Sequence, residues 1–170
     1  MIPTETRETI CRLYDYRCGY CGVHEHEAGS ELEIDHFQPR AANGGDEPEN
    51  LVYCCPACNR IKSDFRPSNK SAENPRRLLH PGRDNLSAHL SEDTDGRLIA
   101  LSETGRYHIS RLRLNRPQLL ALRLRRRMNE SIRQKLAAVS AEREQLRMEV
   151  AELSRELEEA LALLDRLRSE

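Results

Sequence analysis

Two pairs of cysteines with metal-ligand spacing frame the residues of this chain that can do chemistry. Cys18 and Cys21 form the first Cys-x-x-Cys pair, and Cys55 and Cys58 form the second. Four thiolates in two such pairs are typical of a closed tetrahedral Zn²⁺ site that stabilises a fold. We therefore expect one structural zinc ion. Buried free thiols or redox cysteines are the alternative, and the ligand spacing of both pairs disfavours it.

Side chains suited to acid–base and hard-metal chemistry lie between and just after the two pairs. The imidazole of a histidine has an unperturbed pKa near neutral pH, so His36 can be a general base, and Asp35 beside it offers an oxygen ligand for Mg²⁺ or Mn²⁺. Asn59 follows the last cysteine, so the zinc site fixes its place, and its amide oxygen can be a second ligand. Neighbours on a regular strand point to opposite faces, so Asp35 and His36 share a site only at a strand end or bulge. The pattern predicts metal-dependent hydrolysis.

Over a core of residues 18–62, these residues resemble the signature of the HNH nuclease family, the ββα-metal fold. Asn in place of His at the final signature position is an accepted variant and disfavours a softer ion such as Ni²⁺ or Zn²⁺ there. A weaker resemblance to a subgroup of bacterial HNH proteins continues as far as Arg116. The resemblance implies that His36 activates water, Asp35 and Asn59 bind the divalent ion, Asn50 orients His36 and Lys62 contacts phosphate.

The net charge of −1 conceals a strong segregation of charge. Residues 106–135 hold ten Arg and Lys side chains against Glu130 alone, a net +9, whereas residues 136–170 carry −4. A concentrated basic stretch is typical of nucleic-acid binding, and a solvated helix face is the alternative. We expect DNA phosphate contacts here and, because no base-reading module is visible, little sequence specificity. The arginines expected to contact DNA are Arg111, Arg113, Arg116, Arg123, Arg125, Arg126 and Arg127.

The C-terminal third of the chain predicts one long helix. Asn115 and Pro117 suit a helix cap and a first turn, and no Gly or Pro follows Pro117. Apolar residues then repeat with 3–4 spacing, which predicts a coiled coil from about residue 132. The seam, with Arg143 as its one polar interruption, comprises Leu136, Val139, Leu146, Val150, Leu153, Leu157, Ala160, Leu164 and Leu167.

A seam of this length needs a second helix to cover it. We expect a homodimer through the C-terminal coiled coil, with a heterologous helical partner as the alternative. Arg143 is poorly matched to itself in a parallel dimer, whereas an antiparallel pairing sets it near an acid such as Glu149 or Glu156. Folding back within the chain is the third option, but no turn residue follows Pro117.

The expected fold class is α+β: a small zinc-stapled ββα-metal domain followed by a long C-terminal coiled-coil helix. Within the domain we expect a short helix capped by Thr4 or Thr6 and a turn at Gly105. The expected divisions are 1–66 for the HNH nuclease core, 67–114 for a wrapping segment with a β-hairpin, and 115–170 for the basic, then amphipathic helix.

Composition narrows the class of protein. The sequence has no Trp and two Phe residues, so its core is aromatic-poor and gains from a zinc staple. We expect neither a signal peptide nor a membrane span, which together with thiolate-bound zinc indicates a reducing cytoplasm. The expected function is a metal-dependent DNA endonuclease, for which a bacterial defence or mobile-element system is one setting by family analogy. A non-catalytic zinc-binding module that docks nucleic acid or a partner protein through the coiled coil is the alternative.

Overall fold

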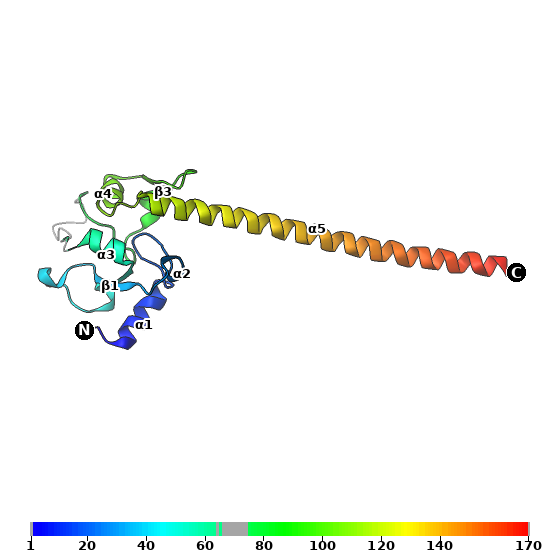
Figure 1. Cartoon of the computed structure of the whole chain (residues 1–170), viewed down its shortest axis with the longest axis horizontal. Helices are drawn as coiled ribbons and strands as arrows, with labels where there is room; N and C mark the ends of the chain where they lie inside the picture. The colour runs from blue at the N-terminus through cyan, green and yellow to red at the C-terminus, as the bar shows by residue number, and fades with distance from the viewer. Residues whose placement is uncertain (1, 64, 66–74, 170) are drawn as a thin grey trace. The chain divides into compact units, whose positions relative to one another are not determined.

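The computed structural model describes residues 2–63, 65 and 75–169 (Figure 1). The chain divides into two compact units, Met1–Leu124 and Arg125–Glu170. In chain order the elements are α1 (Thr4–Leu13), α2 (Glu25–Ala28), β1 (Glu33–His36), η1 (Arg40–Ala42), η2 (Pro48–Asn50), β2 (Leu51–Cys54), α3 (Pro56–Lys62), η3 (Leu86–Ala88), β3 (Leu90–Glu92), β4 (Leu98–Ala100), α4 (Glu103–Arg111) and α5 (Pro117–Arg168).

A short antiparallel hairpin and the helix after it form the centre of the first unit. β1 pairs with β2, with Glu33 opposite Cys54 and His36 opposite Leu51. β2 is buried along its whole length and leads through Cys55 into α3, which packs against β1. This β–β–α arrangement and the long C-terminal helix confirm the predicted α+β fold.

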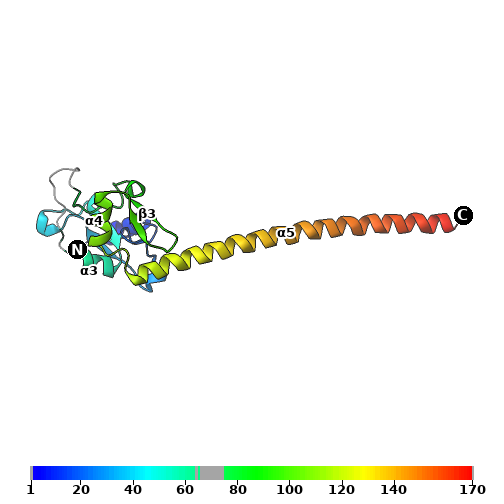
Figure 2. The same cartoon turned by 90° about the horizontal axis from the view of Figure 1, so that it is seen from above.

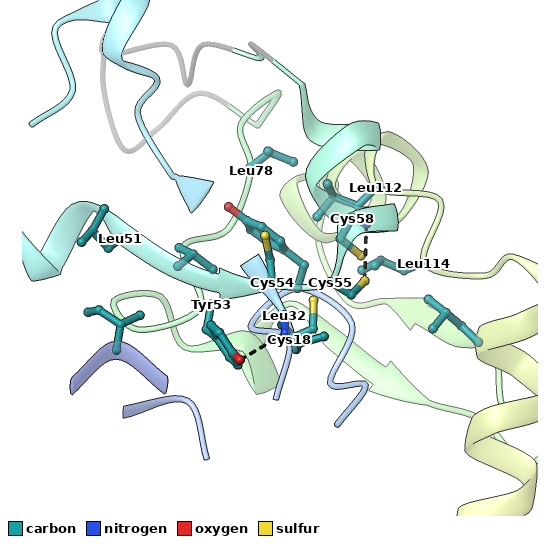
Figure 3. Packing of buried hydrophobic residues seen from close by; sticks show 14 of the residues in the cluster. Cys18, Leu32, Leu51, Tyr53, Cys54, Cys55, Cys58, Leu78, Leu112 and Leu114 are labelled. Carbon is teal, nitrogen blue, oxygen red and sulfur yellow. Dashed lines mark hydrogen bonds between the residues drawn. The ribbon is translucent and has the colours of Figure 1, made fainter. Parts of the chain in front are cut away.

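The core of the first unit is mostly aliphatic and sulfur-rich, and among the described residues its buried aromatic side chains are Tyr20 and Tyr53. Tyr53 from β2 lies beside Leu32 and accepts a hydrogen bond from its backbone N–H at 3.2 Å, while Leu78 and Leu112 come from later segments (Figure 3). Leu78 and Leu79 are at most 1% exposed. They anchor the described part of the expected wrapping segment; residues 66–74 lie outside the described residues.

His108 fixes the same segment from α4. Its ring Nδ1 accepts the backbone N–H of Leu79 at 3.0 Å, and the side chain is 2% exposed. Burial lowers the pKa of His108 to about 4, because the charged imidazolium would lose its hydration there. His108 is therefore a neutral, structural histidine at physiological pH.

Three local expectations are wrong in detail. α1 begins after Pro3 with no side-chain cap, so neither Thr4 nor Thr6 caps it. Gly105 lies inside α4, where a Cβ would come within 2.1 Å of a backbone oxygen of His89, so glycine is needed for close packing rather than for a turn. Asn115 exchanges two hydrogen bonds with the backbone of Leu98 on β4 instead of capping α5.

The second unit consists of the remainder of α5. Figures 1 and 2 both show α5 as one unbroken helix. Its apolar seam residues are exposed within this single chain, for example Leu136 at 65% and Leu153 at 63%. Among the described residues no helix is both long and apolar enough to cross a membrane.

Candidate metal-dependent nuclease site

The four expected zinc ligands converge from two turns. Cys18 and Cys21 lie in a tight turn before β1, closed by a 2.7 Å hydrogen bond from the Gly22 N–H to the Cys18 carbonyl. Cys55 is the N-cap residue of α3, and Cys58 lies in its first turn. Gly22 has a φ of +72°, a conformation that glycine adopts without strain.

The spacing of the four sulfurs fits a tetrahedral Zn²⁺ ion. All four Sγ atoms lie within 4.8 Å of one another, and the Sγ atoms of Cys21 and Cys55 are 3.8 Å apart. A tetrahedron with Zn–S bonds of about 2.3 Å has S···S edges of about 3.8 Å. Cys54 is buried on β2 outside this cluster, and burial raises the pKa of its thiol.

Hydrogen-bond donors favour a thiolate at Cys55, whereas burial raises the pKa of Cys18. Hydrogen bonds from the neighbouring thiols hold the pKa of Cys55 well below its usual range, and the backbone N–H of Cys58 also points at the Cys55 sulfur at 3.4 Å. The guanidinium of Arg116 donates to the Cys58 sulfur at 3.4 Å. These donors support negative charge where a zinc ion needs anionic ligands.

His36 lies at the end of β1 and is held by a carboxylate that sequence reasoning missed. Its ring Nε2 is 2.6 Å from Oδ1 of Asp46, and Arg40 donates two hydrogen bonds to the Asp46 carboxylate at 2.6 and 2.7 Å. An ionised carboxylate only accepts, so the contact with Asp46 requires the proton on Nε2 and leaves the lone pair on Nδ1, although the Nε–H of Arg40 also points at Nε2 at 3.3 Å. Hydrogen bonds from His36 and Arg40 lower the pKa of Asp46.

Asn50 fixes the loop that carries Asp46. Its amide oxygen accepts the N–H of Gln38 at 2.8 Å, and its amide nitrogen donates to the carbonyls of Gln38 and Gly45 at 3.1 and 2.8 Å. The side chain is 7% exposed. Asn50 therefore bonds the backbone at both ends of the loop between His36 and Asp46, and its role in orienting His36 stays a prediction.

Asp35 is a buried partner of Lys62. The Nζ atom of Lys62 lies 3.0 and 2.9 Å from the two Asp35 carboxylate oxygens and also donates to the His36 carbonyl at 2.8 Å. The Tyr20 hydroxyl donates to Asp35 at 2.7 Å. Burial raises the pKa of Asp35, and the nearby Lys62 charge opposes that rise. Lys62 is 0% exposed, which argues against the phosphate contact expected of it.

Asn59 and Asp35 line the same surface hollow as His36. β1 ends at His36, so Asp35 and His36 share the hollow without a bulge. Asn59, one turn before the end of α3, donates its amide N–H to Glu33 at 2.7 Å. That bond fixes which end of the Asn59 amide faces Glu33. The hollow is lined by Ile34, Asp35, His36, Pro39, Arg40, Ala41, Asn59, Lys62 and Ser63.

Comparison with known proteins agrees with this geometry. Residues 18–65 match the family model described as HNH endonuclease. These residues form an HNH domain. The chain is also similar to the Septu protein PtuA of Bacillus mycoides (strain KBAB4), with 27% identity over 140 residues that cover 66% of this chain and 19% of the relative. The chain thus spans about a fifth of the length of that curated relative. No solved structure matches the chain closely enough to count as similar.

Several of the basic residues expected to contact DNA serve the fold around the HNH domain. Arg111 donates to the carbonyls of Ile61 and Lys62 at the C-terminal end of α3, the latter at 2.8 Å. Arg123 is 7% exposed and donates to the carbonyls of Gly96 and Leu114 at 3.0 and 2.8 Å. With Arg116 bonded to the Cys58 sulfur, these three arginines bind protein atoms, and Arg123 is too buried to reach a phosphate.

A second hollow borders α3 of the HNH domain and is basic. Arg60 and Arg113 are exposed side chains that line it together with Ala57, Ile61 and Arg111. Arg60 directly follows Asn59 in the sequence, so its place near the site could have been predicted. The places of Asp46 and Arg40, by contrast, could not, because only the folded loop brings them to His36.

Proposed function

We propose that this protein is a metal-dependent endonuclease that hydrolyses DNA phosphodiester bonds with little intrinsic sequence specificity. The observation that carries the proposal is the convergence of His36, Asp35 and Asn59 on one hollow of an HNH domain. A zinc cluster beside the hollow suits a structural role, because four thiolates leave no open position for a substrate.

His36 is the proposed general base. With Nε2 bound to Asp46, the Nδ1 atom has the lone pair that accepts a proton from the attacking water. Asp46, itself held by Arg40, is a positioning residue that fixes the tautomer and stabilises the imidazolium formed during the reaction. Asn50 acts on His36 indirectly, because it fixes the backbone of the Asp46 loop at Gln38 and Gly45.

Asp35 and Asn59 are the proposed ligands of a catalytic Mg²⁺ or Mn²⁺ ion. Both offer hard oxygen donors and both line the hollow, so the donor set fits such an ion. The ion, when bound, supplies charge stabilisation at the scissile phosphate and at the leaving oxygen. Lys62 keeps Asp35 neutralised and connects β1 to α3, so we assign it a structural role instead of a phosphate contact.

Phosphate contacts outside the hollow fall to exposed basic residues. Arg113 and Arg125 are exposed, and Arg60 joins Arg113 at the basic hollow. Arg126 and Arg127 stay in the proposed set because they belong to the same run of charge. Such contacts are made to the backbone and carry no sequence information, which supports low specificity.

The seam of α5 and the curated relative support a role in an assembly. We propose that α5 pairs with a second copy of the chain or with a helical partner, since its apolar side chains are exposed in one chain. The likeness to a Septu protein supports a setting in a bacterial defence system. The non-catalytic alternative has one observation in its favour, namely the engagement of Asp35 by Lys62.

A plasmid-relaxation assay tests the proposal. Protein treated with a chelator of hard ions is given supercoiled DNA with no added ion, with Mg²⁺ or with Mn²⁺. We expect nicking only with an added ion, and much weaker nicking by Asn59→Ala at the same ion concentration. His26→Ala, an exposed side chain outside the hollow, is the control and should nick with the same ion dependence as the wild type. No cleavage under any ion, with DNA binding intact, would favour the non-catalytic module.

A further inference from the structure

The exposed face of α5 carries a pattern of charged residues beside its apolar repeat. In the second unit, which is this helix alone, the large apolar seam side chains are 52–65% exposed. From residue 136 the seam repeats with alternating steps of three and four residues and without a break. The same phase extends backwards through Ile132 to Asn129. Each residue of α5 from 129 onward thus has a fixed heptad position.

The charges at the two positions beside the seam differ in sign. The g positions from residue 135 onward carry Glu142, Glu149 and Glu156, with Lys135 as the one positive exception and Leu163 as the last member, whereas the e positions carry Arg133, Arg147 and Arg168 together with serines and one leucine. In a parallel pair, a g residue faces the e residue of the next heptad on the other helix. In an antiparallel pair, g faces g and e faces e. The e and g charges therefore report on orientation.

The e and g charges favour the parallel arrangement over an antiparallel pairing along the whole seam. In parallel register Glu142 faces Arg147 of the second helix, which gives two ion pairs per dimer, and Glu149 faces a serine. In the antiparallel register that overlaps the whole seam, Glu142 faces Glu156, the two Glu149 side chains face each other, and so do the two Arg147 side chains. Like charges opposed across an interface disfavour that pairing.

The two polar seam residues fit the same orientation. Asn129 is at an a position, where a single Asn selects register and a two-stranded parallel pair at some cost in stability. Arg143 is also at an a position, and in a parallel pair it lies beside Glu142 of the other helix. That acid, which also faces Arg147, lies between the two arginines of the other helix and so offsets part of the repulsion between the two Arg143 side chains.

We propose that α5 forms a parallel two-stranded coiled coil with α5 of a second copy of this chain, over residues 129–168. Each HNH domain precedes the N-terminal end of α5, so a parallel pair tethers both domains to the same end of the coiled coil. Two strand-cutting sites joined at one end can act on one duplex. The inference rests on the proposed pairing of α5 with a second copy, while its tests measure no nuclease activity and so can fail independently of the nuclease assignment.

Site-directed disulfide formation in the zinc-loaded full chain tests the orientation. Leu167→Cys places a thiol at a seam position near one end, so two copies meet only if the helices are parallel. Ala162→Cys, on the outer face, is the matched control. We expect a dimer by light scattering at micromolar concentration, with oxidation cross-linking Leu167→Cys and leaving Ala162→Cys free. A monomer, a higher oligomer, or a dimer in which Leu167→Cys does not cross-link would each overturn the proposal.

A charge exchange gives a second, independent readout. Glu142→Lys should weaken the dimer at least tenfold, because the new lysine faces Arg147 and lies beside Arg143 of the other helix. Adding Arg147→Glu restores the opposite-charge contact and should recover most of the affinity. Equal dissociation constants for the wild type and Glu142→Lys would contradict the parallel register.

Discussion

Replacing Lys62 tests whether its ammonium group has a structural role or binds the phosphate of the substrate. Its ammonium is 0% exposed and lies within 3.0 Å of both Asp35 oxygens, so Lys62→Met leaves a carboxylate that is 8% exposed without its cation. Removing one partner of a buried ion pair costs about 3–5 kcal/mol. For a domain of this size that loss lowers the melting temperature by roughly 10–20 °C.

Tyrosine fluorescence makes this measurement specific to the first unit. All five tyrosines precede residue 108 and the chain has no Trp, so the emission does not report on the coiled coil. Unfolding by urea would be followed for the wild type, Lys62→Met, Asp35→Asn and the double variant. The double variant should recover about 1–3 kcal/mol relative to the sum of the single changes, because it leaves no buried charge unpaired.

The opposite pattern would refute this reasoning. If Lys62 contacts phosphate, Lys62→Met should unfold within about 0.5 kcal/mol of the wild type and bind DNA more weakly. Additive single changes would likewise show that Asp35 and Lys62 do not depend on each other.

Three further predictions follow from the same structure. Cys55→Ser should lose its zinc, measured by elemental analysis, together with folded soluble protein, whereas Cys54→Ser should keep about one zinc per chain. Asp46→Asn should lower the cleavage rate about 10-fold or more with little change in DNA affinity, because it perturbs the tautomer of His36; an unchanged rate would remove Asp46 from the site. The pKa of His108 is about 4 when folded and about 6.5 when unfolded, so its stabilisation of about 3 kcal/mol is present above pH 6.5 and is lost as the pH falls from 6.5 towards 4. Urea midpoints of His108→Gln should therefore depend less on pH across that range than those of the control His26→Gln.

The parts of the site that local spacing determines were predictable. The cysteine pairs lie on tight turns, and Asn59 follows one of them directly, so their convergence depends on few residues. The contacts of Asp46 and Lys62 were not predictable from the sequence, because each depends on how two segments pack. The loop fixed by Asn50 brings Asp46 to His36, and the packing of α3 on β1 buries Lys62.

The basic stretch, residues 106–135, also shows what could not be predicted from the sequence alone. A count of charge cannot distinguish an arginine that faces solvent from one that donates to backbone carbonyls. Arg111 and Arg123 use their guanidinium groups to close gaps between segments, and their long apolar stems suit them to that position. The exposed Arg60 lies outside the stretch, and only the fold brings it beside Arg113.

Single-turnover cleavage of a labelled DNA duplex by His36→Ala tests the central claim most directly. With enzyme in excess over DNA and Mg²⁺ or Mn²⁺ at saturation, loss of the general base should slow cleavage by about 10²–10⁴-fold. DNA affinity, zinc content and the urea midpoint should stay close to the wild type, and His26→Ala, an exposed histidine outside the hollow, should cleave at the wild-type rate. Cleavage by His36→Ala at the wild-type rate would contradict the assignment of this hollow as the nuclease site.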